Sequence, residues 1–144
     1  MFNKILVASD GSGPAMNAAE AAAAIATAMS AKLTVATVSY VPKAYAGDIS
    51  PGMRQGYVDE WEQVLNATVA VVKRQGVEPE ARLLREEEPV SAILHEIERG
   101  QYDLLVVGRT GAGGSGIRKT ALAIMGGVSM KLLANAECSV LVVH

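Results

Sequence analysis

Cysteine and aromatic residues are scarce in this sequence of 144 residues. It contains one cysteine, Cys138, so no disulfide can form within it and no cysteine cluster can hold a metal. That usage favours a reducing compartment. With one Phe and one Trp, the core must come from Ala, Val and Leu, which suits helices packed closely on a sheet.

Strong charge of one sign and long apolar runs are missing as well. The formal net charge is −2 and no basic block is present, although nucleic-acid binders need one. The longest mostly apolar region, residues 18–31, is interrupted by polar residues and is too short to span a membrane. Met1 leads directly into an apolar run without the pattern of a signal peptide. We therefore expect a cytoplasmic protein with no nucleic-acid and no membrane partner.

Apolar runs and helical periodicity alternate along the chain. Strands are expected at residues 5–8, 32–38, 80–85, 102–108 and 139–143, and helices at about 14–31, 57–75, 90–99 and 120–134. The stretch 42–56 is rich in Pro, Gly, Ser and Asp and predicts a loop. Because most of the strands are continuously apolar, we predict one α/β domain, residues 1–144, with a parallel sheet covered on both faces.

Polar and glycine residues follow two of these strands, where ligands bind in open parallel sheets. The run Gly108–Gly116 could bring backbone N–H groups to a phosphate, or it could be an ordinary surface loop. Asp10, after the first strand, could accept hydrogen bonds from ribose hydroxyls or an adenine amino group. Its carboxylate could equally bond backbone N–H groups of a local turn, and both roles can hold at once.

Two named glycine motifs fit only superficially. Gly111, Gly113 and Gly116 match a dinucleotide fingerprint, but the acid about twenty residues on, Glu137, falls at the start of a strand instead of its end. A P-loop is excluded because Lys119 arrives two residues late. No nucleophile is paired with a base and no metal-ligand spacing is present, so we predict no catalytic residue and no metal site.

Four segments, in this order and at these separations, carry a resemblance to a known family. They are Ile5–Ser12, Tyr102–Gly111, Gly126–Ser129 and Cys138–Val143. On these segments the chain resembles the universal stress protein family from end to end. The resemblance implies a three-layer sandwich with a five-stranded parallel sheet, Rossmann-like and of the adenine nucleotide alpha hydrolase-like type. It also implies a homodimer formed through the C-terminal strand, and an exposed edge strand invites such pairing.

Nucleotide-binding members of the family hold ATP with a Gly-x2-Gly-x9-Gly-Ser/Thr pattern, and other members lack it. If Gly108 and Gly111 form the first pair, fourteen residues precede Gly126, an insertion of five; Gly113 and Gly116 as the pair keep the spacing of nine. In both registers Gly127 replaces Ser or Thr. The lost hydroxyl is worth about 0.5–1.5 kcal/mol, which predicts weaker binding but not its loss.

The resemblance places the nucleotide against three groups of residues. The adenosine would lie beside Ala8, Ser9 and Asp10, with Val38 beside the adenine. The ribose and phosphates would be lined by Val107, Gly108, Arg109, Thr110 and Gly111, or by Gly113 and Gly116 in the other register. The phosphate site would be closed by Gly126, Gly127, Val128 and Ser129.

The favoured hypothesis is a regulatory stress-response protein that binds ATP, with or without Mg²⁺, and hydrolyses it slowly at most. The alternative is a dimeric interaction module of the same family that binds no nucleotide, which the insertion and Gly127 favour. A phospho-acceptor signalling domain is disfavoured because Asp10 stands alone without the clustered acids that such a site needs.

Overall fold

A computed structural model describes residues 1–41, 47, 49–85, 88–109 and 127–144. Five parallel strands form one sheet in the order β3-β2-β1-β4-β5. The strands are β1 (Lys4–Ala8), β2 (Lys32–Ser39), β3 (Glu80–Arg85), β4 (Leu104–Gly108) and β5 (Ser139–Val143). The helices are α1 (Gly13–Met29), α2 (Pro51–Arg74) and α3 (Pro89–Gly100), and residues 127–135 are also helical. In the described ranges, no helix is long and apolar enough to cross a membrane.

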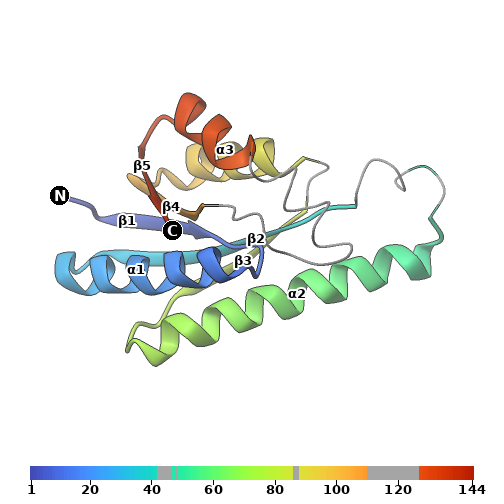
Figure 1. Ribbon diagram of the computed structural model, residues 1–144, viewed down its shortest axis with the longest axis horizontal. Coiled ribbons are helices and arrows are strands. Elements are labelled where there is room, and N and C mark those ends of the chain that lie inside the picture. Colours follow the sequence, from blue (N-terminus) through green and yellow to red (C-terminus); the bar gives the residue numbers. More distant parts are fainter. Residues whose placement is uncertain (42–46, 48, 86–87, 110–126) are drawn as a thin grey trace.

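Helices cover both faces of the sheet (Figure 1). Ile5 and Val7 of β1 pack with α1 and α2 in one apolar cluster, whereas Leu6 packs with α3 and residues 127–135 in another. Alternate residues of a strand point to opposite faces, so each strand contributes to both clusters. The predicted three-layer α/β sandwich with a five-stranded parallel sheet is confirmed.

The order of the strands determines where a ligand can bind. Ile5 of β1 is paired with Leu33 of β2 on one side and with Leu104 of β4 on the other. The strands that follow β1 in the sequence are therefore added on both of its sides, β2 and β3 on one and β4 and β5 on the other. In such sheets a crevice opens at the carboxyl ends of the strands where the strand order reverses, which here is between β1 and β4.

Side-chain caps begin α1 and α3. The Ser12 hydroxyl accepts a hydrogen bond from the Ala15 amide at 3.3 Å, and a proline occupies the first turn of α1. The Glu88 carboxylate accepts from the amides of Val90 and Ser91 at 3.2 and 2.9 Å. Such caps satisfy amides that lack a partner within the helix. Glu88 is therefore the N-cap of α3.

The expected loop 42–56 is wrong in its second half, because α2 begins at Pro51. The Ser50 hydroxyl accepts a hydrogen bond from the Met53 amide at 3.2 Å, and Pro51 occupies the first turn. Gly52 and Gly56 lie inside the helix although each glycine costs about 1 kcal/mol there. The Ser-Pro start and the apolar contacts of the rest of α2 outweigh that cost.

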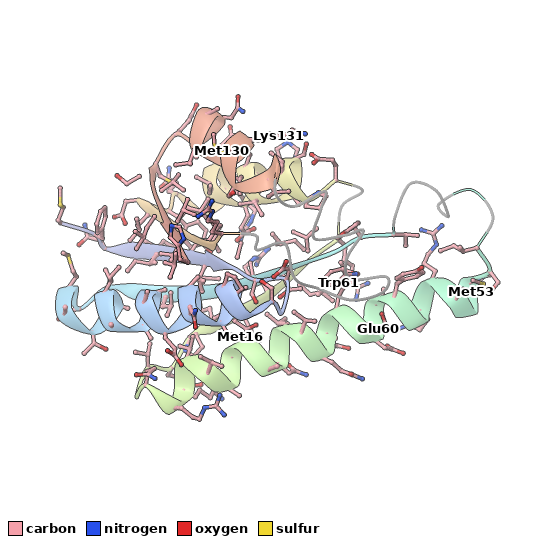
Figure 2. The ribbon with its side chains drawn as sticks, in the orientation of Figure 1. Met16, Met53, Glu60, Trp61, Met130 and Lys131 are labelled. Atoms are coloured by element: carbon pink, nitrogen blue, oxygen red, sulfur yellow. The ribbon has the colours of Figure 1, made fainter. Side chains whose placement is uncertain are left out.

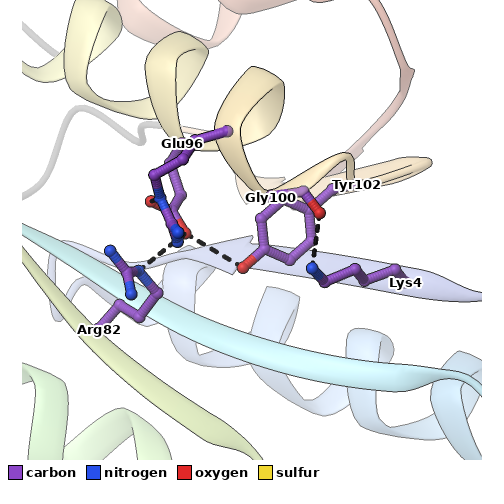
Figure 3. A network of polar contacts seen from close by, with 6 residues as sticks. Lys4, Arg82, Glu96, Gly100 and Tyr102 are labelled. Atoms are coloured by element: carbon purple, nitrogen blue, oxygen red, sulfur yellow. Dashed lines mark hydrogen bonds and ion pairs between the residues drawn. The ribbon is translucent and has the colours of Figure 1, made fainter.

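A buried carboxylate joins α3 to the sheet beneath it (Figure 3). Glu96 is 3% exposed and lies 2.8 Å from Nε of Arg82 on β3. It also accepts hydrogen bonds from Nη2 of Arg99 at 2.7 Å and from the Tyr102 hydroxyl at 3.2 Å. Nζ of Lys4 lies 4.8 Å from the centre of the Tyr102 ring and donates to the Gly100 carbonyl at 2.6 Å. These contacts fix the end of α3 against β1 and β3.

Candidate functional site

A pocket opens at the carboxyl ends of β1, β2 and β4. Its walls come from the ends of these strands, from both helical layers and from the start of α1; the lining residues are Ala8, Ser9, Asp10, Ala15, Val38, Tyr40, Trp61, Pro89, Ile93, Val107, Gly108, Val128 and Ser129. The fold thus brings together residues up to 121 positions apart in the sequence, Ala8 and Ser129 being the extremes. The residues that the sequence predicted and that line this pocket are Ala8, Ser9, Asp10, Val38, Val107, Gly108, Val128 and Ser129.

Two further predicted residues, Arg109 and Gly127, are described by the structure and do not line the pocket. Arg109 is exposed at the end of β4, where its amide donates to the Val143 carbonyl at 2.6 Å and its Nη1 lies 3.2 Å from Nδ1 of His144. Gly127 is helical, and it does not line the pocket. The predicted contacts at Thr110, Gly111, Gly113, Gly116 and Gly126 lie outside the described residues.

Asp10 forms the local turn with one carboxylate oxygen and leaves the other oxygen without a partner among the described residues. Its Oδ1 accepts a hydrogen bond from the Ser12 amide at 3.0 Å, which forms the local turn before α1. Its Oδ2 is buried and has no partner among the described residues. A carboxylate oxygen can only accept, so Oδ2 is available to a ligand that offers a hydroxyl or an amino group.

The Ser9 hydroxyl belongs to a chain of hydrogen bonds that connects the β1–α1 loop to α2. It accepts a hydrogen bond from the Gly11 amide at 3.2 Å and lies 2.8 Å from the hydroxyl of Thr68. Thr68 is fully buried and donates to the Val64 carbonyl at 2.9 Å. Since Thr68 uses its proton on that carbonyl, Ser9 must donate to Thr68. This hydrogen bond holds Ser9, which lines the pocket, against α2.

Gly108 permits a close approach between β4 and α1. A Cβ atom at this position would lie 2.5 Å from the backbone nitrogen of Ala15 and from the backbone carbon of Pro14. Any side chain here would push the start of α1 away from the end of β4. The glycine is thus needed for packing at the base of the pocket, whatever it does for a ligand.

Two aromatic residues that the sequence did not assign to the site form one wall of the pocket. They are Tyr40 and Trp61, whose ring centres are 5.2 Å apart with a 30° angle between the ring planes. Nε1 of Trp61 also donates a hydrogen bond to the Tyr40 carbonyl at 3.1 Å. Trp61 projects from α2 toward the sheet (Figure 2). Burial first, and then the negative charge of Asp10, raise the pKa of the Tyr40 phenol. Its phenol therefore stays protonated at neutral pH.

Other lining residues were missed for a simple reason. Trp61 recurs with the helical period of α2, a pattern typical of core residues, while Ala15, Pro89 and Ile93 are ordinary apolar residues. The one available signal was the position of Tyr40, two residues beyond Val38 at the same strand end.

The arrangement suits binding of a flat ligand that carries hydroxyl groups. One wall is aromatic and aliphatic, and a free carboxylate oxygen lies at the end of β1. Within the described part of the chain, no three His, Cys, Asp or Glu side chains are grouped as a metal site requires. The fold and the pocket together define a doubly wound α/β domain with a pocket at its switch point, which is the candidate ligand site.

Comparisons with known proteins identify the family. The sequence matches the model of the Universal stress protein family over residues 1–144. It is 33% identical to a curated universal stress protein of Thermus aquaticus, with all of both chains covered. A solved universal stress protein in complex with cAMP is 27% identical, with a TM-score of 0.73 and 99% and 97% of the two chains covered. The universal stress protein of Archaeoglobus fulgidus, 20% identical over the whole of both chains, shares the fold with a TM-score of 0.75. The chain belongs to the universal stress protein family.

Proposed function

We propose that the pocket binds an adenine nucleotide, ATP with or without Mg²⁺, and that the protein is a regulator in the stress response of the cytoplasm. One observation carries the proposal: the buried Oδ2 of Asp10 lacks a partner among the described residues and lies in a pocket at the switch point of the sheet. The relative whose structure contains cAMP, 27% identical to this chain, supports an adenine nucleotide as the ligand.

The order of chemical groups along the sheet edge supports one orientation of that nucleotide. Tyr40 follows β2, with the Trp61 ring of α2 against it, Asp10 follows β1, and Arg109 follows β4. A nucleotide presents an apolar base, a ribose with hydroxyls and anionic phosphates in the same order. The base would face β2, the ribose Asp10, and the phosphates the end of β4, where an arginine charge favours them.

We propose binding as the role of this site, with hydrolysis slow at most. Among the described pocket residues, no hydroxyl or thiol is paired with a base that would activate it. The Ser9 hydroxyl is engaged with Thr68 and Gly11. A bound nucleotide would then act by stabilising the conformation that contains it.

We also propose that two copies of this single domain associate through β5. β5 lies at the end of the sheet and pairs with β4 on one side. Its other edge carries backbone groups that a second β5 could bind, and an apolar edge strand favours such pairing.

The test is calorimetric titration of the purified protein and its Asp10→Asn variant with ATP, with and without Mg²⁺. The asparagine oxygen can keep the Ser12 bond, but an amino group replaces the free Oδ2 and cannot accept a hydrogen bond. We expect saturable binding that weakens about 10-fold to 100-fold in the variant, because hydrogen bonds to charged groups contribute about 1.5–3 kcal/mol.

Trp61, the only tryptophan, lies in the pocket wall, so its fluorescence gives an independent readout of binding. Asp59→Asn, an exposed position of α2 outside the pocket, is the matched control and should bind like the wild type. Absence of heat, of a fluorescence change and of thermal stabilisation at millimolar ATP would reject the proposal. The dimeric interaction module without nucleotide would then be favoured.

A further inference from the structure

The Tyr40 hydroxyl is a second unpartnered polar group in the pocket. Tyr40 is 7% exposed, and its hydroxyl is buried with no hydrogen-bond partner among the described residues. A buried hydroxyl without a partner destabilises the protein that contains it. A phenylalanine would fill the same space without that cost. The contacts of the described fold give no reason for a hydroxyl at this position, so the reason has to be sought in something that binds there.

The position of Tyr40 in the pocket is well defined by its neighbours. The Tyr40 carbonyl accepts the indole N–H of Trp61 at 3.1 Å, and the two rings are in contact. The ring also belongs to the apolar cluster that contains Val38 and Ile93. The hydroxyl is therefore carried by a ring that is fixed on several sides, as a recognition group should be.

We propose that the Tyr40 hydroxyl is a specificity-determining group, which hydrogen-bonds the edge of the adenine base. The inference rests on the proposed function and adds the residue that recognises the base. Adenine offers an amino donor and ring-nitrogen acceptors, and a phenol can serve either because it both donates and accepts. The free oxygen of Asp10 remains for the ribose.

Position along the sheet edge favours the base over the other parts of the nucleotide. Tyr40 follows β2, and β1 separates that strand from β4, where the glycine run begins. The aromatic wall of Tyr40 and Trp61 offers a flat apolar surface. Anionic phosphates would lose their hydration against such an apolar wall, which disfavours them there.

The experiment compares the wild type with Tyr40→Phe and measures two quantities, the affinity for ATP and the melting temperature without ligand. We expect the variant to bind ATP about 3-fold to 10-fold more weakly, which is the effect of one neutral hydrogen bond. We expect its melting temperature without ligand to be equal or higher, because the substitution removes a polar group that has no partner in the free protein. A purely structural tyrosine would give the opposite result, a lower melting temperature with unchanged affinity.

Tyr102→Phe is the matched control. The Tyr102 hydroxyl donates to Glu96 at 3.2 Å and lies outside the pocket. This variant should lose thermal stability and keep its affinity for ATP. A crystal structure of the wild type with ATP then locates the contact, and Oη of Tyr40 should lie within hydrogen-bond distance of a base nitrogen.

The outcomes separate this inference from the proposed function. If the wild type does not bind ATP, the proposed function fails and the inference fails with it. If the wild type binds and Tyr40→Phe binds equally well, only the inference is wrong. A crystal structure with the hydroxyl on ribose, on phosphate or on water alone would also overturn it.

Discussion

Glu96 shows how a single buried charge is made stable. Burial alone would raise the pKa of its carboxyl, but hydrogen bonds from Arg99, the charges of Arg82 and Arg99, and the Tyr102 hydroxyl outweigh it, so the pKa is lowered. A group whose pKa is lower in the folded state stabilises that state above its unfolded pKa. The stabilisation is lost as the pH falls through the folded pKa.

The prediction concerns Glu96→Gln. At neutral pH we expect the free energy of unfolding to fall by about 1–3 kcal/mol, because a neutral amide leaves the two arginines without their buried counter-charge. Below the usual glutamate pKa of 4.5, the difference from the wild type should shrink, because Glu96 of the unfolded chain then takes up a proton, and it should be smallest below the lowered pKa of the folded state. Urea denaturation across the acid range measures both effects.

Glu98→Gln, an exposed position on the same helix, is the control and should change the unfolding free energy little. A constant difference between wild type and Glu96→Gln at all pH values would contradict the prediction.

At the scale of the element, α1 shows what an alanine-rich helix achieves. Its buried positions are Ala15, Ala18, Ala19, Ala22, Ala23 and Ala26. A methyl group is the smallest side chain that still fills the space, so the helix axis lies close to the sheet and the start of α1 reaches Gly108. The close contact that shapes the base of the pocket depends on these small residues.

The prediction for this element compares two substitutions of the same kind. Ala22→Leu places a large side chain at a fully buried position, and we expect a loss of about 1–3 kcal/mol in unfolding free energy by denaturant titration. Ala24→Leu, at an exposed position of the same helix, should stay within about 0.5 kcal/mol of the wild type. Equal losses at both positions would show that the packing argument is wrong.

At the scale of the whole molecule, β5 is an edge strand of the sheet, and a second copy of the chain could pair with its free edge. Leu141, in the middle of that strand, is 36% exposed although it is a large apolar residue. We predict that the wild type is a dimer in solution and that Leu141→Glu is a monomer, because it would place two buried charges in the interface. Light scattering coupled to size-exclusion chromatography measures both masses.

Met29→Glu is the control, because Met29 is a similarly exposed apolar residue, 41% exposed, that lies at the end of α1 and not on β5. It should leave the mass unchanged. A monomeric wild type at micromolar concentration, or a dimer that persists in Leu141→Glu with an unchanged circular dichroism spectrum, would reject the β5 interface.

Much of the architecture could be read from local patterns. Continuous apolar runs predicted the strands because a strand buried on both faces cannot carry polar residues, and Ser12 and Glu88 began helices because their side chains satisfy free amides. The start of α2 was misplaced because the glycines after Ser50 resemble those of a loop, and only the packing of the helix outweighs them. The position of Asp10 at a strand end was likewise visible in the sequence.

The sequence by itself thus determined the class of the fold, the ends of the strands and the acceptor at the first of them. Only the tertiary structure decided which ends meet, and with them the aromatic wall and the Ser9–Thr68 contact across 59 residues. The physical reason is that local patterns report which side of a strand or helix is buried. The partner against which it is buried depends on the strand order and on how each helix crosses the sheet, and no single segment encodes these.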